Sequence, residues 1–412
     1  MRRRLGPIVA EQLPGRRVLV HLFSADDIRT LYREEGRMPH HVGSLPLKLY
    51  HRSRTPELFA NDGLLHSQGK EWQHLRTQAH GGVSDPRTIH AYGEDLAHIA
   101  DDVVRLIASS RDSAGEVKDC HTIMRRWAFE SIVFLTINKR MGVLESDLNP
   151  RSEGASLMEA IDDFFSMLNI LTTKFPFYRY FSTPYYRRFV RSADDVTRYF
   201  FPLVMAAAQE ALREGSPKNN TLLANLQRLG GLNQKEIFTV TADSIFAGSE
   251  TTAAAATYCF YCLAMNSEAQ ERARKEVFLA MAERGNRRYS RLPYVRACIK
   301  EALRFYPPVS AVHRKLDHDV VMSGYVIPKN TVLRNELFVS GRLEENFTRA
   351  SEFLPERWIR SGRQDAEPWT LHPFASLPFS TGPRMCIGRR IAEMELCTLI
   401  AQVTNQNYCD FD

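Results

Sequence analysis

The sequence predicts a mainly α-helical protein with small β-sheets, organised as one domain. Apolar residues recur at helical spacing over most of the 412 residues, and the few strand patterns gather in one region. The composition, with 44% hydrophobic and 25% charged residues, is that of a folded globular chain. No internal repeat and no linker divides the sequence, so we expect a single domain over residues 1–412.

Several helices follow from capping residues and apolar spacing. Residues 18–23 form a short apolar run, and Ser24-Ala-Asp-Asp is a good cap for a helix through Tyr32. Helical spacing then predicts four further helices, at 86–109, 121–136, 157–171 and 184–213.

The longest predicted helix covers residues 233–265, which is roughly 50 Å at 1.5 Å per residue. It is apolar nearly all round after Thr252, as expected of a helix that runs through the middle of a protein. Strands are predicted at 320–322 and 325–327, around the turn Ser323-Gly324, and again from Thr331.

Composition and charge exclude several classes of protein. The seven cysteines are too few and too scattered for a disulfide scaffold, and they suit a reducing compartment. A net charge of +6 is too small to indicate binding to nucleic acid, and no such partner is expected. No run of 18 apolar residues predicts a membrane-spanning helix. No targeting segment is visible, because the basic start lacks the apolar core of a secretory signal.

The most informative segment lies near the C-terminus. Cys386 sits in a loop of small and turn-forming residues, just before a helical pattern whose backbone N–H groups favour a thiolate. Gly382 and Gly388 let the backbone approach a flat ligand, Phe379 shields the sulfur, and Arg384 neutralises an acidic group. A lone cysteine is more often a buried structural residue. A structural cysteine, however, would not explain why Phe379, Gly382, Arg384 and Gly388 stand at fixed offsets from it.

At this point the sequence resembles the cytochrome P450 family. Its Phe-x-x-Gly-x-Arg-x-Cys-x-Gly signature is matched by Phe379, Gly382, Arg384, Cys386 and Gly388. The resemblance implies that Cys386 is the axial thiolate ligand of haem iron (heme b, iron-protoporphyrin IX). It also implies the fold of that family, in which a long central helix lies over the haem. One position departs from the pattern, because this chain has Ser380 where the family usually has a further glycine.

Other residues match the family's haem-carboxylate partners. Trp72 and Arg76 lie one helical turn apart, and Arg314 follows a Pro-Pro stretch. The resemblance implies that these three residues and Arg384 bind the haem propionates. Several arginines suit two carboxylates, because arginine forms strong charge-assisted hydrogen bonds. Taken singly, each arginine is more typical of a solvated surface charge.

The long helix carries an acid and an alcohol side by side, Glu250 and Thr251, after the small pair Ala247-Gly248. In the family, the small pair leaves room over the iron. The acid–alcohol pair delivers protons during oxygen activation without flooding the site with water. In isolation, the same residues would be a polar patch inside a helix.

Glu301 and Arg304 form Glu-x-x-Arg, and Arg357 lies in the later Pro-Glu-Arg-Trp stretch. In isolation, the first two would be a surface ion pair at i, i+3, which contributes little to stability. The resemblance implies instead a buried triad that is structural and not catalytic.

Three segments, at 63–72, 372–379 and 388–393, look most like the mitochondrial branch of the family. Members of that branch take electrons from a small acidic ferredoxin. The resemblance implies that Arg296 and Lys300, four apart on one helix face, dock this partner. The alternative is a solvated basic face. The branch also implies a mitochondrial location, peripheral to the inner membrane, with some contact with that membrane.

The resemblance therefore implies a haem-thiolate monooxygenase that inserts one atom of dioxygen (O2) into a small lipophilic, sterol- or steroid-like substrate. Three alternatives stay open: a xenobiotic-oxidising monooxygenase, a non-catalytic or inactive shortened haem protein, and an oxygen-independent haem-thiolate isomerase. The isomerase would not need the pair Glu250–Thr251. Compared with the family, the chain looks incomplete at both ends, before Gly6 and after the helix that contains Glu393.

Overall fold

The computed structural model describes residues 5–12, 18–55, 57–84, 89, 91–213, 221–284, 292–359 and 371–405. The chain divides into two units. Unit 1 comprises Met1–Val42, Gly93–Met124 and Thr251–Asp412, and unit 2 comprises Gly43–Tyr92 and Arg125–Glu250. Two helices, α8 (Cys120–Ile137) and α12 (Gln234–Ala264), have residues in both units. The single domain that the sequence predicts stays a prediction.

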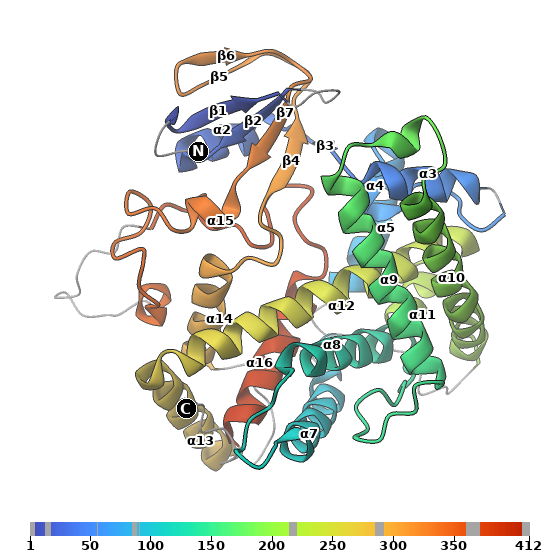
Figure 1. Cartoon of the computed structure of the whole chain (residues 1–412), viewed down its shortest axis with the longest axis vertical. Coiled ribbons are helices and arrows are strands. Elements are labelled where there is room, and N and C mark those ends of the chain that lie inside the picture. The colour runs from blue at the N-terminus through green and yellow to red at the C-terminus, as the bar shows by residue number, and fades with distance from the viewer. Residues whose placement is uncertain are drawn as a thin grey trace. The chain divides into compact units, whose positions relative to one another are not determined.

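All the strands found in the described residues belong to unit 1 (Figure 1). Its elements are β1 (Ile8–Glu11), β2 (Leu19–Leu22), α2 (Ala25–Glu34), β3 (His40–His41), α7 (Gly93–Ser110), α13 (Ser267–Arg284), α14 (Pro293–Phe305), β4 (Val312–Lys315), β5 (Val320–Met322), β6 (Tyr325–Ile327), β7 (Val332–Asn335), α15 (Leu337–Ser340), the 3-10 turn η4 (Pro355–Trp358) and α16 (Arg389–Asn405).

Five of these strands form a mixed sheet in the order β1-β2-β7-β4-β3. β2 pairs antiparallel with β1 and parallel with β7, so the N-terminal residues join a segment from much later in the chain. β5 and β6 form a separate hairpin. One apolar core connects sheet, hairpin and α2, and it includes Leu22, Leu31, Met322 and Leu333.

The predicted hairpin is confirmed. Ser323 (φ 47°) and Gly324 (φ 81°) both lie in the left-handed region, as a two-residue type I′ turn requires. Asp27 of α2 accepts the Ser323 N–H at 2.9 Å, which ties the turn to the helix. The sequence did not predict β1, β2, β3 and β4 as strands, because strands of two to four residues are too short to show alternation.

Unit 2 is helical. Its elements are α3 (Leu45–Ser53), α4 (Gly63–His66), α5 (Gly69–Ser84), α9 (Glu153–Thr173), the 3-10 turn η1 (Phe177–Arg179), α10 (Pro184–Ala211) and α11 (Leu222–Leu229). α9 packs on α10, and α11 packs on α5. Phe164 of α9 lies at the centre of this packing, with ring centroids 5.2 Å from Phe189 and 5.0 Å from Phe246 of α12.

The main predicted helices are confirmed as α8, α9, α10 and α12, with ends that differ by a few residues. The helix predicted over 86–109 is confirmed from Gly93 as α7, while residues 86–88 and 90 lie outside the described residues. α2 starts after Ser24 as predicted, but the Ser24 side chain makes no capping hydrogen bond. In the part of the chain that the structure describes, no helix combines the length and apolar character needed to cross a membrane.

The expectation that α12, apolar nearly all round after Thr252, runs through the middle of the protein is not met at two positions. Tyr258 and Tyr261 are 37% and 51% exposed. Both rings pack against Tyr306, and the Tyr258 ring stacks on it at a centroid distance of 4.8 Å. At these two positions, the Tyr306 ring covers part of the helix surface in place of a surrounding core.

Candidate functional site

The loop before α16 presents one cysteine. The Cys386 N–H donates to the Phe379 carbonyl at 2.9 Å, and the Met385 N–H donates to the Gly382 carbonyl at 3.1 Å. These two bonds close the loop on itself, and α16 begins at Arg389. Cys386 therefore lies directly before a helix N-terminus, where the sequence places it.

Accessibility separates Cys386 from the other cysteines. Of the six cysteines in the described residues, only Cys386 is exposed. Burial raises the pKa of the remaining thiols, which are Cys120, Cys259, Cys262, Cys298 and Cys397. A cysteine that binds a metal has to be deprotonated and within reach. Among these six, Cys386 is therefore the residue best placed to hold iron.

The loop backbone explains the departure at Ser380. Ser380 has φ 58° and Gly382 has φ 74°, and both values lie in the left-handed region that favours glycine. A further glycine at 380 would adopt this conformation without a Cβ penalty. In this chain, the Ser380 hydroxyl lies 3.0 Å from the Tyr32 hydroxyl, a contact that glycine could not make.

The two glycines expected to let a flat ligand approach differ. A Cβ built on Gly388 has no atom within 4 Å, so this position leaves room for a ligand. A Cβ built on Gly382 would collide with Oε1 of Glu35. The space at Gly382 is therefore filled by protein and the space at Gly388 is open. The approach of a flat ligand at Gly388 stays a prediction.

Arg314 of β4 is buried beside this loop. Its Nε donates to Oε2 of Glu35 at 2.8 Å, and its Nη1 donates to the His313 carbonyl at 3.1 Å. Nη1 also lies 3.2 Å from Nδ1 of His41, and Nη2 lies 3.5 Å from Oγ of Ser380. Arg314 thus contacts both the N-terminal segment and the signature loop.

Arg384 in the loop donates from Nε to the Pro39 carbonyl at 3.1 Å. Burial raises the pKa of the Glu35 carboxyl, although Arg314 and Arg384 both oppose that effect. Cys386, the two arginines and Glu35 therefore belong to one cluster within unit 1. Such a cluster, with an exposed thiol, guanidinium groups and room at Gly388, fits a haem with its carboxylates.

Sequence reasoning missed Glu35 and Tyr32. They lie at the C-terminal end of α2, and their partners are on β4 and in the signature loop. No local pattern marks such a contact.

Gly248 of α12 has a different role from the one expected. A Cβ built on it would lie 2.7 Å from Cγ1 of Ile132, so the glycine allows close packing of α12 against α8. The exposed residues of this helix turn are Ala247 and Thr251, four apart on one face. Any room for a ligand therefore lies beside Ala247 and not at Gly248.

Glu250 is connected to further charged groups. Nε of Arg125 lies 3.4 Å from Oε2 of Glu250, and the same guanidinium pairs with Asp162. The Glu250 side chain is 38% exposed and that of Asp162 is 40% exposed. The exposed part of the Glu250 carboxylate, next to Thr251, can take protons directly from solvent, while the Arg125 guanidinium holds it in place.

Trp72 and Arg76 lie on one face of α5, in unit 2. The Trp72 side chain is 3% exposed and Arg76 is half-buried. Their role as propionate partners stays a prediction.

Asp243 of α12, which the sequence analysis did not select, is partly buried in unit 2. Its Oδ2 accepts the Leu64 N–H of α4 at 2.7 Å. Gly63 (φ 78°) is required there, because a Cβ would lie 2.5 Å from the same oxygen. Burial raises the pKa of Asp243 to about 7, against the lowering effect of the N–H groups of Leu64 and Leu65.

This burial predicts a dependence of stability on pH. An Asp with a raised folded-state pKa binds its proton more tightly when folded, so its contribution is complete below about pH 4 and lost as pH rises through about 7. Asp243→Asn should remove this dependence, which between pH 5 and pH 8 is of the order of 3 kcal/mol, from about two pH units at about 1.4 kcal/mol each. Urea unfolding at pH 5 and pH 8 measures it. An equal pH dependence in both proteins would contradict the burial of the charge.

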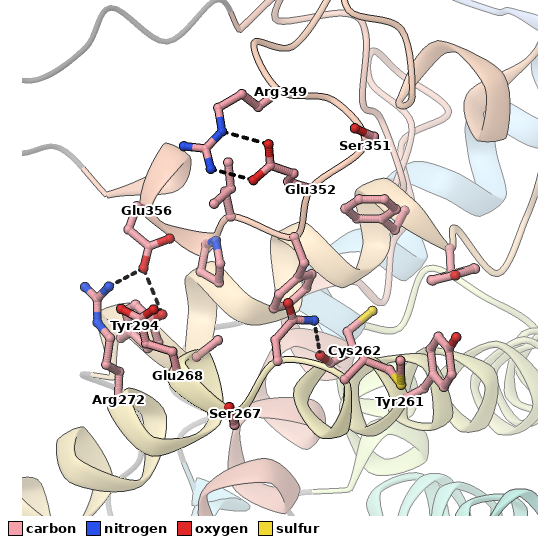
Figure 2. Close-up of a pocket in the computed structure, with 18 residues that line it drawn as sticks. Tyr261, Cys262, Ser267, Glu268, Arg272, Tyr294, Arg349, Ser351, Glu352 and Glu356 are labelled. Atoms are coloured by element: carbon pink, nitrogen blue, oxygen red, sulfur yellow. Dashed lines mark hydrogen bonds and ion pairs between the residues drawn. The ribbon is translucent and has the colours of Figure 1, made fainter.

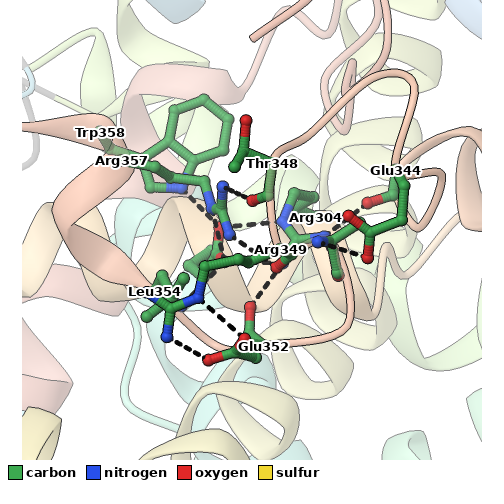
Figure 3. A network of polar contacts seen from close by, with 11 residues as sticks. Arg304, Glu344, Thr348, Arg349, Glu352, Leu354, Arg357 and Trp358 are labelled. Carbon is green, nitrogen blue, oxygen red and sulfur yellow. Dashed lines mark hydrogen bonds and ion pairs between the residues drawn. The ribbon is translucent and has the colours of Figure 1, made fainter. Parts of the chain in front are cut away.

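Glu301 of α14 is the centre of a buried polar network, and its donors Arg304, Arg357 and Trp358 are labelled in Figure 3. Arg304 donates to it from Nη2 at 2.7 Å and from Nε at 2.9 Å, and Arg357 donates from Nε at 3.0 Å. All three side chains are 0% exposed. Trp358, which the sequence analysis did not assign, donates from Nε1 at 2.7 Å. The guanidinium groups also donate to backbone carbonyls, namely those of Gly341, Thr348, Arg349, Ala350 and Glu352.

The basic residues expected to dock a partner are accessible. Arg296 and Lys300 of α14 are exposed, as are Arg389 and Arg390 of α16. Arg296 lies near the Cys397 thiol of α16, where its charge opposes the rise that burial causes in the pKa of that thiol. α14 and α16 pack together, so these basic side chains lie on two adjacent helices.

A cavity of about 820 Å³ lies in unit 1 between the end of α12, the start of α13 and residues 349–356 (Figure 2). Four of the charged side chains that line it form two ion pairs, Arg272 with Glu356 and Arg349 with Glu352, and Glu268 also lines it. None of the predicted site residues lines it. It is therefore distinct from the Cys386 cluster.

Comparisons with a protein-family model and with known proteins point to one family. A protein-family model described as "Cytochrome P450" matches residues 1–406. A Drosophila melanogaster protein, "Probable cytochrome P450 12a5, mitochondrial", is 32% identical over 93% of this chain and 74% of its own length. The Mus musculus protein "1,25-dihydroxyvitamin D(3) 24-hydroxylase, mitochondrial" is 29% identical over 92% of this chain and 71% of its own.

The fold has a match among solved structures. "Retinoic acid bound cyanobacterial CYP120A1" superposes with a TM-score of 0.77 at 20% identity and covers 98% of this chain and 85% of that one. At this identity, the likeness concerns the fold.

Proposed function

Because the chain belongs to the cytochrome P450 family and is a monooxygenase of that haem-dependent family, we propose that it oxidises a small lipophilic, sterol- or steroid-like substrate. The observation that carries the proposal is Cys386, the only exposed thiol among the described cysteines, directly before α16. We propose heme b as the cofactor, with O2 as co-substrate. When bound to a thiolate, haem supplies the oxygen chemistry. The mouse relative, named as a vitamin D hydroxylase, supports the substrate class.

In this proposal, Glu250 and Thr251 supply protons. Glu250 exchanges protons with solvent through its exposed edge, and the neighbouring Arg125, itself paired with Asp162, orients the carboxylate. Thr251, exposed on the same helix, passes them on from its Oγ1 hydroxyl. Neither residue holds the cofactor.

Thr251→Ala should therefore retain haem and the thiolate spectrum but lose about 10-fold or more in product formed per electron consumed, with peroxide in its place. The measurement is the ratio of product and peroxide to NADPH consumed, with ferredoxin and its reductase present. Thr252→Ala, at the buried neighbour, is the matched control. Unchanged coupling in Thr251→Ala would remove Thr251 from the proton path.

We further propose a mitochondrial location and an acidic ferredoxin as electron donor. The names of the fly and mouse relatives support the location. The exposed basic residues of α14 and α16 support the donor, because a positive surface steers an acidic partner.

Reversal of the two charges on α14, Arg296→Glu with Lys300→Glu, should lower ferredoxin-driven turnover at least 10-fold and weaken its dependence on salt. Peroxide-driven turnover bypasses the donor and should persist. The double reversal Lys118→Glu with Lys329→Glu changes the net charge equally at other exposed positions of unit 1 and should have little effect. Equal ferredoxin-driven rates in both variants would exclude docking on α14.

Peripheral contact with a membrane is part of this proposal. Between α9 and α10, unit 2 exposes the aromatic side chains of Phe175, Phe177, Tyr180 and Phe181, at 40% to 76%. Lys174 and Arg179 lie in the same segment. Aromatic rings with neighbouring cations are typical of segments that rest in the membrane interface.

A further inference from the structure

We propose that Glu35 is a positioning residue for the cofactor: it fixes the Arg314 guanidinium so that the Nη2 edge faces the signature loop and binds a haem carboxylate. The inference rests on the proposed function. It starts from the burial of this ion pair, in which the Glu35 side chain is 1% exposed and that of Arg314 is 2% exposed. Arginine is the residue best suited to a carboxylate in such a place, because its donors form a rigid fork.

The donors of Arg314 are used unevenly. Nε is taken by Glu35, and the Nη1 protons face the His313 carbonyl and Nδ1 of His41. Nη2 makes one long hydrogen bond, of 3.5 Å, to Oγ of Ser380. A guanidinium has five donor protons. The edge with remaining capacity is therefore the one directed at the loop that carries Cys386.

Glu35 also contacts the loop directly. Its Oε1 is buried without a hydrogen-bond partner among the described residues, and it occupies the space that a Cβ at Gly382 would need. A buried oxygen without a hydrogen-bond partner lowers the stability of the fold, so the presence of the Glu35 carboxylate here calls for an explanation. Here the carboxylate sets the direction of Arg314 and, at the same time, supports the backbone of the loop at its left-handed glycine.

Haem retention tests the positioning role. Glu35→Ala should release haem to apomyoglobin about 10-fold faster than the unmodified protein, and Glu35→Gln, which keeps an acceptor for Nε, should restore most of the retention. Glu34→Ala is the matched control, because its carboxylate is exposed and pairs with His318 at the surface. In a double-mutant cycle, Glu35→Ala should add little once Arg314 is already alanine. Additive effects, or haem release at the unmodified rate, would overturn the proposal.

The reduction potential provides a second measurement. Glu35→Gln removes a negative charge beside the arginines, so the midpoint potential should shift to a more positive value, while Glu34→Gln should leave it unchanged. An unchanged potential in Glu35→Gln would contradict the proposal even if the alanine variant does not fold. Failure of the proposed function would give a different result from failure of this inference: the unmodified chain itself would not bind haem through a thiolate.

Discussion

Replacement of Cys386 by serine should abolish the long-wavelength absorption band that thiolate ligation gives to the reduced, carbon-monoxide-bound protein. A serine hydroxyl is neither as soft nor as easily deprotonated as a thiol, so it cannot replace the sulfur on iron. Monooxygenase turnover should fall by at least 1000-fold. Difference spectra and product formation, each per mole of protein, measure the two effects.

Cys120→Ser is the matched control, because this thiol is partly accessible and lies outside the signature loop. It should keep both the band and the activity. If Cys386→Ser kept the band, another residue would hold the iron, and the proposal that starts from the exposed thiol would fail.

The second large effect is expected at Glu301. Its removal leaves the guanidinium groups of Arg304 and Arg357 buried without a carboxylate. Loss of one partner from a buried ion pair costs about 3–5 kcal/mol, which is a large part of the stability of a typical protein. Glu301→Ala should therefore lower the free energy of unfolding in urea by that amount and reduce the yield of haem-loaded protein.

A matched control lies in the same region. Glu352 pairs with Arg349, and both side chains are 48% exposed, so Glu352→Ala should leave the free energy of unfolding almost unchanged. Equal losses in the two variants would mean that burial does not decide the strength of these pairs. An intact fold in Glu301→Ala would contradict the structural role proposed for the triad.

Local patterns in the sequence were sufficient for several parts of this protein. The turn Ser323-Gly324 predicts its hairpin because only a few residues tolerate a left-handed backbone. Glu301 and Arg304 are adjacent on one helix face whatever else the chain does, since they are three residues apart. Cys386 was identified from the offsets of its neighbours within a single loop.

Other features depend on contacts between distant parts of the chain, and these only the tertiary structure decided. Glu35 meets Arg314 and Gly382, Asp243 meets Leu64, and Trp358 joins Glu301. In each case, the two partners lie on different elements, and neither has a local pattern that depends on the other. The reason is physical: a sequence pattern reports the period of one helix or strand, whereas the environment of a buried charge is set by whatever the fold packs around it.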